Sequence, residues 1–230
     1  MDYVILNAGI CATSFRTNES TGHEETTQTN YLSTALLAAL LLPVAKSKIQ
    51  AQNGQPTRIT FTSSDVASWT AFKEKSSTPL LASLDRQASS VDMTDRMMVS
   101  KLLGQFYMSE LARRVPSSVV CINCATPGMV QGTQFNREVD ATFGGKLVKP
   151  IIRRLGYTPE VGARYITDAA LQHGDEEVHG QYLSTQKLKP MAPIIYTKEG
   201  DRISAQLWRE TMSEFAFANV EQIINDVGKP

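Results

Sequence analysis

The sequence predicts an α/β fold in which a parallel sheet is flanked by helices. Strand-like and helix-like segments alternate along the chain, which is the pattern of βαβ units. The first strand-like segment, Tyr3–Leu6, is an unbroken apolar run closed by Asn7-Ala8-Gly9, as expected of a strand buried on both faces of a parallel sheet. The 230 residues suit one domain.

Three further segments are rich in apolar and β-branched residues and lie between turn-forming residues, so each is predicted to be a strand. They are Arg58–Thr62, Ser118–Ala125 and Gly180–Ser184. The turn-rich segment Gln52–Pro56 separates the second strand from the helix before it, and Thr126-Pro127-Gly128 ends the third strand.

The helices are predicted from composition and from their end signals. Thr29–Lys46 is apolar nearly all round, which predicts a buried helix rather than an amphipathic one. Asp92 is the predicted N-cap of the long helix Met93–Arg114. Thr158-Pro159-Glu160 begins a helix that runs to about residue 173, with Thr as cap and Pro in the first position. Asp201–Asn225 supplies one or two C-terminal helices.

Two long connections lack a clean period. Ser68–Val91 is long for a connection inside one domain, so we expect a functional lid or short helices there. Gln131–Tyr157 contains three glycines and is expected to be a mobile segment after the third strand.

The overall charge favours no polymeric partner. Twenty-three basic and 23 acidic residues cancel, so no net field attracts nucleic acid or an anionic membrane. Hydrophobic content of 42% and charged content of 20% are typical of a soluble globular protein, which we expect in the cytoplasm. Asp2 stands where a signal peptide would carry positive charge, and the apolar stretch Leu32–Ala45 is too short to span a bilayer.

Neither a disulfide nor a metal site is expected. Cys121 and Cys124 lie three positions apart in a predicted strand, so their side chains point to opposite faces of the sheet. Together with Cys11 they are expected to be reduced and structural. The histidines are scattered along the chain, at His23, His173 and His179.

Several short motifs stand at the predicted strand ends and on the helices that face them, where ligands bind in open α/β sheets. They are Asn30, Ser63-Ser64, Ser100-Lys101 and Pro127-Gly128. In this order they resemble the short-chain dehydrogenase/reductase family, which has a Rossmann-like parallel sheet. Glu25–Tyr31 and Glu110–Arg114 resemble its retinol-dehydrogenase-like and WW-domain-oxidoreductase-like branch. The resemblance covers about residues 2–185, so it sets the expected core of the domain at residues 1–185 and leaves 186–230 as a helical tail.

The resemblance implies hydride transfer between a nicotinamide and a carbonyl or alcohol. Asn30, Ser64 and Lys101 match the Asn, Ser and Lys of the family's site. The position of its general acid, a Tyr four residues before the Lys, is Met97. A thioether can neither donate nor accept a proton, so we expect redox catalysis to be lost.

The resemblance also implies that the chain begins at the family's fourth strand and lacks its first strands and Gly-rich dinucleotide loop. We therefore expect no cofactor, with NADP as the alternative. The parts of a cofactor site that remain would be vestigial, namely Asn7, Gly9, Pro127 and Gly128. The expected substrate pocket consists of Met97, Met98, Asp65 and Met129.

The leading hypothesis is a non-redox catalyst, a cyclase or isomerase, acting on a small apolar metabolite of secondary metabolism. One alternative is an NADPH-dependent reductase with an atypical active site. The other is a catalytically dead partner of a full-length relative. We expect a homodimer, formed through the helices Thr29–Lys46 and Met93–Arg114 or through the open edge of the first strand.

Overall fold

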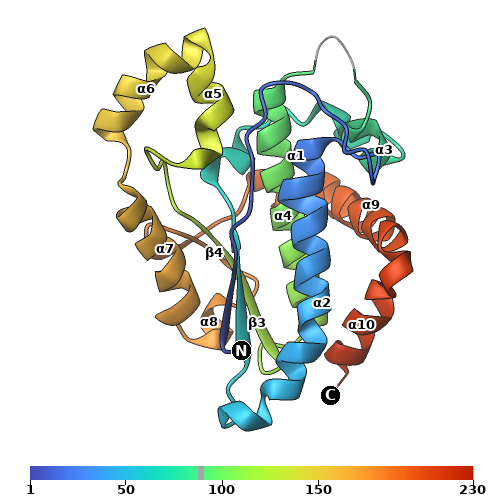
Figure 1. Cartoon of the computed structure of the whole chain (residues 1–230). Coiled ribbons are helices and arrows are strands. Elements are labelled where there is room, and N and C mark those ends of the chain that lie inside the picture. Colours follow the sequence, from blue (N-terminus) through green and yellow to red (C-terminus); the bar gives the residue numbers. More distant parts are fainter. Residues whose placement is uncertain (88–90, 230) are drawn as a thin grey trace.

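The computed structural model describes residues 1–87 and 91–229, and it confirms the predicted fold class. A five-stranded sheet in the order β1-β2-β3-β4-β5 has helices on both faces (Figure 1). The first four strands are parallel, and the fifth is antiparallel to the fourth. The strands are β1 (Tyr3–Leu6), β2 (Thr57–Thr62), β3 (Val120–Thr126), β4 (Tyr182–Ser184) and β5 (Lys187–Lys189).

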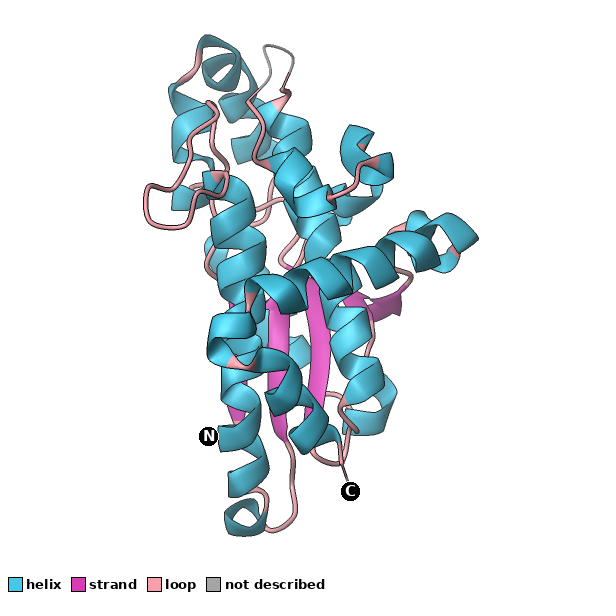
Figure 2. Cartoon of the chain, turned by 90° about the vertical axis from the view of Figure 1, so that its right-hand side faces the viewer, coloured by secondary structure: helices cyan, strands magenta, loops and turns pink. Residues whose placement is uncertain are grey.

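Two groups of long helices sandwich the sheet. On one face α2 (Ser33–Lys48) and α4 (Met93–Arg114) pack against the strands, and α9 (Lys198–Glu214) and α10 (Val220–Gly228) pack outside them, against α4 and α2. The other face is covered by α7 (Pro159–Leu171) and α8 (Asp175–Val178). Figure 2 shows the C-terminal helices in front of the strands. The remaining helices are α1 (Glu25–Thr27), η1 (Gln28–Leu32), η2 (Gln50–Gln52), η3 (Asp65–Ser68), η4 (Lys73–Ser76), α3 (Leu80–Leu84), η5 (Gln134–Asn136), α5 (Arg137–Ala141), α6 (Phe143–Leu155), η6 (Pro193–Tyr196) and η7 (Ala216–Ala218).

Strand β1 has its predicted bounds, but the prediction that it is buried on both faces is wrong. Within the described residues it pairs with β2 alone, so it is an edge strand. Tyr3 and Ile5 keep 53% and 39% of their surface exposed. An apolar run shows that a strand can be buried, but it does not show which neighbours cover it.

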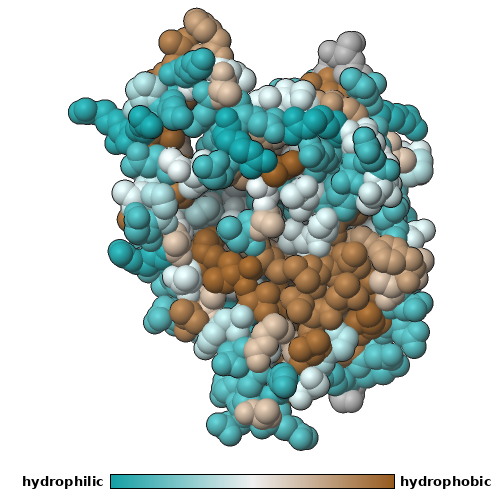
Figure 3. Space-filling view, viewed as in Figure 1, coloured by the Kyte–Doolittle hydropathy of each residue, from teal (hydrophilic) through white to brown (hydrophobic). Residues whose placement is uncertain are grey.

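Helix α2 differs from its prediction in the same way. Its Ala-rich face packs in the core, but Leu37, Leu40 and Val44 are exposed and form an apolar surface beside β1 (Figure 3). By length and composition alone, the helical stretch Glu25–Lys48 could cross a membrane, but in this fold it lies along the sheet. The helix is therefore buried on one face and exposed to solvent on the other, although its sequence is apolar on both.

Helix α4 begins and ends where the sequence predicts. The Asp92 carboxylate accepts hydrogen bonds from the backbone N–H groups of Thr94 and Asp95, at 2.9 and 3.3 Å, so it caps the helix as expected. Thr158 caps α7 in the same way, through the N–H of Val161 at 3.4 Å.

The C-terminal tail is part of the same core. Trp208 of α9 stacks on Tyr107 of α4, with ring centroids 5.7 Å apart, and the Arg114 guanidinium lies 3.9 Å from the Trp208 ring centroid. Lys46 of α2 donates hydrogen bonds to carbonyls at the end of α10. The helices expected to form a dimer interface thus pack against this chain's own tail. A homodimer stays a prediction.

Both long connections contain short helices. Ser68–Val91 includes η4 and α3, and the Glu210 carboxylate of α9 caps α3 through the N–H groups of Leu80 and Leu81, at 2.9 and 2.7 Å. Residues 88–90 of this connection lie outside the described residues. Gln131–Tyr157 contains η5, α5 and α6.

The imidazole of His23 lies between two carboxylates from distant parts of the chain. Its Nδ1 is 2.9 Å from Asp85 Oδ2, and its Nε2 is 3.0 Å from Glu214 Oε1. Burial acts to lower the pKa of His23, but the carboxylates of Glu214 and Asp85 outweigh it, so the pKa is raised above its ordinary value.

The His23 site predicts a pH-dependent stability. The protonated ring is favoured in the folded state, so its stabilisation is complete below the unfolded pKa of about 6.5 and is lost as pH rises through the higher folded pKa. We expect the difference in unfolding midpoint between wild type and His23→Gln to be largest at acidic pH and to shrink towards alkaline pH. Thermal melts across this range measure it, and a difference independent of pH would contradict the assignment.

Candidate active site

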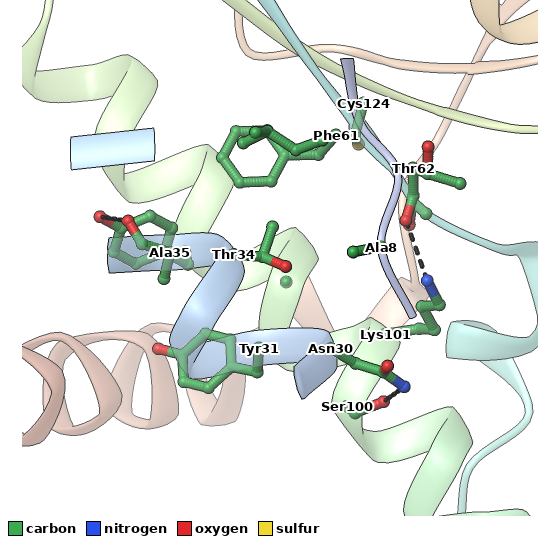
Figure 4. Close-up of a pocket in the computed structure, with 14 residues that line it drawn as sticks. Ala8, Asn30, Tyr31, Thr34, Ala35, Phe61, Thr62, Ser100, Lys101 and Cys124 are labelled. Atoms are coloured by element: carbon green, nitrogen blue, oxygen red, sulfur yellow. Dashed lines mark hydrogen bonds between the residues drawn. The ribbon is translucent and has the colours of Figure 1, made fainter. Parts of the chain in front are cut away.

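A narrow crevice lies at the carboxyl ends of the parallel strands, where sequence analysis expected a ligand site. It is lined by Leu6, Ala8, Asn30, Tyr31, Thr34, Ala35, Phe61, Thr62, Ser63, Ser100, Lys101, Gly104, Tyr107 and Cys124 (Figure 4). Its enclosed volume of about 20 Å³ is far below the several hundred Å³ typical of small-molecule sites. The crevice is therefore too small to enclose a substrate, and the polar side chains of Asn30, Ser100 and Lys101 are among its lining.

Asn30 joins three elements at this mouth. It lies in η1, a π-helical turn that leads directly into α2, and such turns are frequent at functional sites. Its Oδ1 accepts a hydrogen bond from the N–H of Ile10 at 2.8 Å. Its Nδ2 donates to the carbonyl of Ile10 at 3.0 Å and to Ser100 Oγ at 2.9 Å. The amide thus fixes the loop after β1 against α4.

Lys101 is the cationic residue among those that line the crevice, and its pKa is shifted from the ordinary value. Its side chain is buried, and Nζ donates a hydrogen bond to the carbonyl of Thr62 at 3.0 Å. The Phe135 ring centroid lies 5.7 Å from Nζ. Among the described residues no carboxylate lies within ion-pair distance of this ammonium, and burial lowers the pKa of Lys101 to about 8.

Gly9 lets the loop after β1 pass close to both groups. A Cβ at this position would lie 3.2 Å from Asn30 Oδ1 and 3.7 Å from Lys101 Nζ. The structure therefore brings Gly9, Asn30 and Lys101 together, as three of the residues singled out from the sequence.

Two other predicted residues have partners outside the crevice. Ser64 Oγ accepts a hydrogen bond from the N–H of Val66 at 3.4 Å and caps η3. Asp65 accepts a 2.6 Å hydrogen bond from the hydroxyl of Tyr182, and burial together with this carboxylate raises the pKa of Tyr182. The match of Ser64 to the Ser of the family's catalytic site stays a prediction.

The residues of the expected substrate pocket lie outside the narrow crevice, and their assignment to a substrate pocket stays a prediction. Asp65, Met97, Met98 and Met129 are absent from the crevice lining. Met97 and Met98 are half-buried on the first turns of α4, and Met129 is 49% exposed. Sequence proximity to a motif placed these residues near the site, but side-chain direction on the helix and loop decides which of them reach it.

The residues expected to be vestigial lie at strand ends. Asn7 Oδ1 accepts a hydrogen bond from the hydroxyl of Thr62 at 3.1 Å. Pro127 and Gly128 follow β3, and Gly128 has a positive φ of 74°. A Cβ on Gly128 would lie 2.8 Å from the Tyr157 ring, so only glycine fits beneath this ring.

Sequence analysis missed part of the site. Ser100, noted only as the neighbour of Lys101, accepts the hydrogen bond of the Asn30 amide, and its own hydroxyl donates to the carbonyl of Met97 at 2.7 Å. Gln105, one turn after Lys101, donates to Ser63 Oγ at 3.1 Å, a spacing of four residues that could have revealed it. Nothing in the sequence marks Phe135, because it comes from a distant segment.

Helix α5 is tied to the loop after β1. Arg16 Nη2 lies 2.7 Å from Glu138 Oε1, and the N–H of Thr13 donates to Glu138 Oε2 at 3.1 Å. Hydrogen bonds from Arg16 and from the Thr13 backbone hold the pKa of Glu138 at about 2. These contacts keep η5, and with it Phe135, beside the mouth of the crevice.

The cysteines behave as structural residues. All three are buried and free, and Cys121 and Cys124 pack in separate clusters on opposite faces of the sheet, as predicted. Burial raises the pKa of Cys121 to about 12 and raises that of Cys124 as well. Within residues 1–87 and 91–229, no three His, Cys, Asp or Glu side chains gather as metal ligands.

A parallel sheet with helices on both faces, and with buried Asn and Lys side chains at its strand ends, defines a Rossmann-like α/β domain. The comparisons with known proteins agree. The chain is 39% identical to the short-chain dehydrogenase fogG of Aspergillus ruber and 40% identical to the short chain dehydrogenase/reductase mfmJ of Annulohypoxylon moriforme, over 100% and 99% of its length. It is 35% identical to the short chain dehydrogenase virL of Hypocrea virens over 99% of its length. The chain belongs to the short-chain dehydrogenase/reductase family.

The matched region is part of each relative. The chain spans 66%, 64% and 65% of these three proteins, slightly less than two thirds of their length. A solved structure of an uncharacterised protein from Mycobacterium paratuberculosis shares the fold, with a TM-score of 0.60 and 19% identity over 94% of this chain and 67% of its own. No family model matches the chain.

The family corrects one expectation. The sequence-based prediction that no cofactor is used is wrong, because relatives that match this chain over 99–100% of its length are named as dehydrogenases and reductases. None of the matched names supports the cyclase or isomerase activity that was the leading hypothesis.

Proposed function

We propose that this chain carries the catalytic end of a nicotinamide-dependent oxidoreductase, in which Lys101 moves the proton that a Tyr moves elsewhere in the family. The observation that supports this proposal most is the buried Lys101 ammonium, which has no carboxylate partner among the described ion pairs and lies at the mouth of the crevice. The substrate would be a small carbonyl compound or its alcohol, the substrate class that the resemblance to the family implies.

The protonation state of Lys101 suits this role. A general acid or base works best when its pKa lies near the working pH, and burial lowers the pKa of Lys101 to about 8. The carbonyl of Thr62 takes one of the three N–H donors of the ammonium. The remaining donors can reach a substrate oxygen at the mouth and transfer a proton to it.

The residues at the mouth fit the nicotinamide end of a cofactor. When bound, the cofactor supplies or accepts the hydride. Gly9 presents no side chain over Asn30 and Lys101, so a flat ring can approach the loop after β1 closely. Asn7, Gly9, Lys101 and Gly128 would hold this end, and the Asn30 amide would keep the loop after β1 in place.

The pH dependence of the reaction tests the proposal. Carbonyl reduction needs the protonated ammonium, so we expect kcat/KM for reduction to be constant below pH 8 and to fall about tenfold per pH unit above it. Alcohol oxidation needs the neutral amine and should show the opposite dependence. The assay follows NADPH consumption with a panel of ketones.

Lys101→Arg is the matched control, because a guanidinium stays charged over this range and should remove the pH dependence near 8. An unchanged profile in this variant would assign the titration to another group.

Absence of NADP(H) binding in calorimetry would count against the oxidoreductase itself. The alternative, a catalytically dead partner of a full-length relative, predicts that the chain binds this relative and shows no turnover of its own. Secondary metabolism and a cytoplasmic location stay predictions.

A further inference from the structure

Helix α6 exposes an apolar stripe that the active site does not use. Four of its residues recur every fourth position along one side, and Val148 widens the stripe. Phe143, Leu147, Ile151 and Leu155 expose 81%, 63%, 57% and 68% of their surface, and Val148 exposes 48%. Side chains at this spacing lie above one another on a helix, so they form one continuous apolar face. Among the described residues no element covers it.

The charged residues of α6 are all basic. They are Lys146, Lys149, Arg153 and Arg154, and the helix contains no acidic residue. Lys149 forms an ion pair with Asp140 of α5 at 2.7 Å, whereas the described ion pairs include none for the other three. At 100° per residue, Lys146, Lys149 and Arg153 lie on the side of α6 away from the apolar face, and Arg154 lies within that face. The long stem of a Lys or Arg can extend towards the apolar face while its charged head stays in a polar layer.

We propose that α6 binds the surface of an anionic phospholipid bilayer, with its apolar face among the acyl chains and its basic residues at the phosphate groups. An apolar face bordered by Lys and Arg is the pattern of helices that lie in the plane of a membrane. Attraction of basic residues to anionic lipids adds to the burial of the apolar face, so both halves of α6 contribute.

The charge of α6 disfavours a second copy of this chain as the occupant. A symmetric contact of α6 with itself would bring together two helices that each carry four basic residues and no acidic residue. The expectation of no membrane partner came from the zero net charge of the whole chain. Zero net charge of the whole chain is compatible with a basic helix, because α6 itself carries four basic residues and no acidic one.

The position of α6 links this surface to the crevice. It lies with α5 at the end of the molecule that contains the carboxyl ends of the parallel strands (Figure 1). Gly145 allows a tight turn from α5, since a Cβ there would lie 1.8 Å from the carbonyl of Val139. A bilayer bound to α6 would therefore lie at the same end as the mouth of the crevice.

Vesicle co-sedimentation of the whole chain tests the proposal. We expect binding to vesicles of phosphatidylcholine with phosphatidylserine, and much weaker binding to phosphatidylcholine alone. Leu147→Glu with Ile151→Glu should reduce binding by more than about tenfold, because two charges would enter the apolar layer. Lys146→Gln with Arg153→Gln should reduce it about 25-fold, or about fivefold for each charge removed.

Two matched controls distinguish binding through α6 from non-specific binding of apolar or basic residues to vesicles. Leu40→Glu with Val44→Glu changes two exposed apolar residues at the same spacing on α2, and Lys187→Gln with Lys189→Gln removes two exposed charges on β5. Both should bind like wild type. The proposal is overturned if wild type ignores anionic vesicles or if the α2 variant loses as much binding as the α6 variant. A dimer in light scattering that only the α6 variants dissociate would also overturn it, in favour of a second copy.

Discussion

Replacing Lys101 by Met is expected to lower the rate of NADPH-dependent carbonyl reduction by about 10²–10⁴, the contribution of a positioned proton donor. The substitution removes the ammonium and keeps a long apolar side chain in the buried stem position. The protein should fold at least as stably as wild type, because a buried cation without a carboxylate partner costs folding free energy. Steady-state kinetics and a thermal melt on the same preparation measure the two effects.

Lys198→Met is the control for Lys101→Met, since Lys198 is an exposed residue at the start of α9. It should leave both the rate and the melting temperature unchanged. If Lys101→Met keeps the wild-type rate, the ammonium is not the proton donor. If its activity falls only together with its melting temperature, Lys101 acts through the fold instead.

Replacing Met97 by Tyr is expected to raise the reduction rate by about tenfold to a hundredfold, the lower part of the range for a general acid. Residues 97 and 101 lie one helical turn apart on α4, so a phenol at 97 can come near the Lys101 ammonium. The gain is smaller than the full range because Lys101 would already supply part of the proton transfer. The measurement is kcat/KM with NADPH and the ketone panel.

Met98→Tyr is the matched control, because residue 98 is the next half-buried Met on α4 but lies about 100° further round the helix. It should give no gain. An equal gain from both variants would point to a general effect of an aromatic side chain. No gain from Met97→Tyr would mean that a phenol at this position does not reach the reacting oxygen.

The pattern of the chain predicted the secondary structure closely where local chemistry dominates. Helix α4 follows from its Asp92 cap and its length, and β2 and β3 follow from short apolar runs bounded by turns. These features are local, so they are readable without the fold. The tail was predicted only as helices. Its packing against α2 and α4 depends on contacts such as that between Trp208 and Arg114, which no local pattern contains.

The candidate site was predicted in part. Asn30 and Lys101 were found because motif order places them on matching elements, and the structure brings them to one crevice. The Met residues were assigned to the pocket by proximity in sequence alone, and they lie outside its lining. The expectation of no cofactor rested on the missing strands and Gly-rich loop, and it is overturned by relatives named as dehydrogenases and reductases. The loss of redox catalysis was inferred from Met97, and the loss of one proton donor does not exclude a second group near the same oxygen.

The sequence by itself determined the alternation of strands and helices, the opposite directions of Cys121 and Cys124, and the residues that stand at strand ends. All of these depend on how side chains repeat along a strand or a helix, and the order of the residues shows that repeat directly. Only the tertiary structure decided that Tyr3 and Ile5 are exposed, that Lys101 is buried with a lowered pKa, and that the apolar stripe of α6 is uncovered. Burial depends on which distant segments pack on a residue, and that information exists only once the chain has folded.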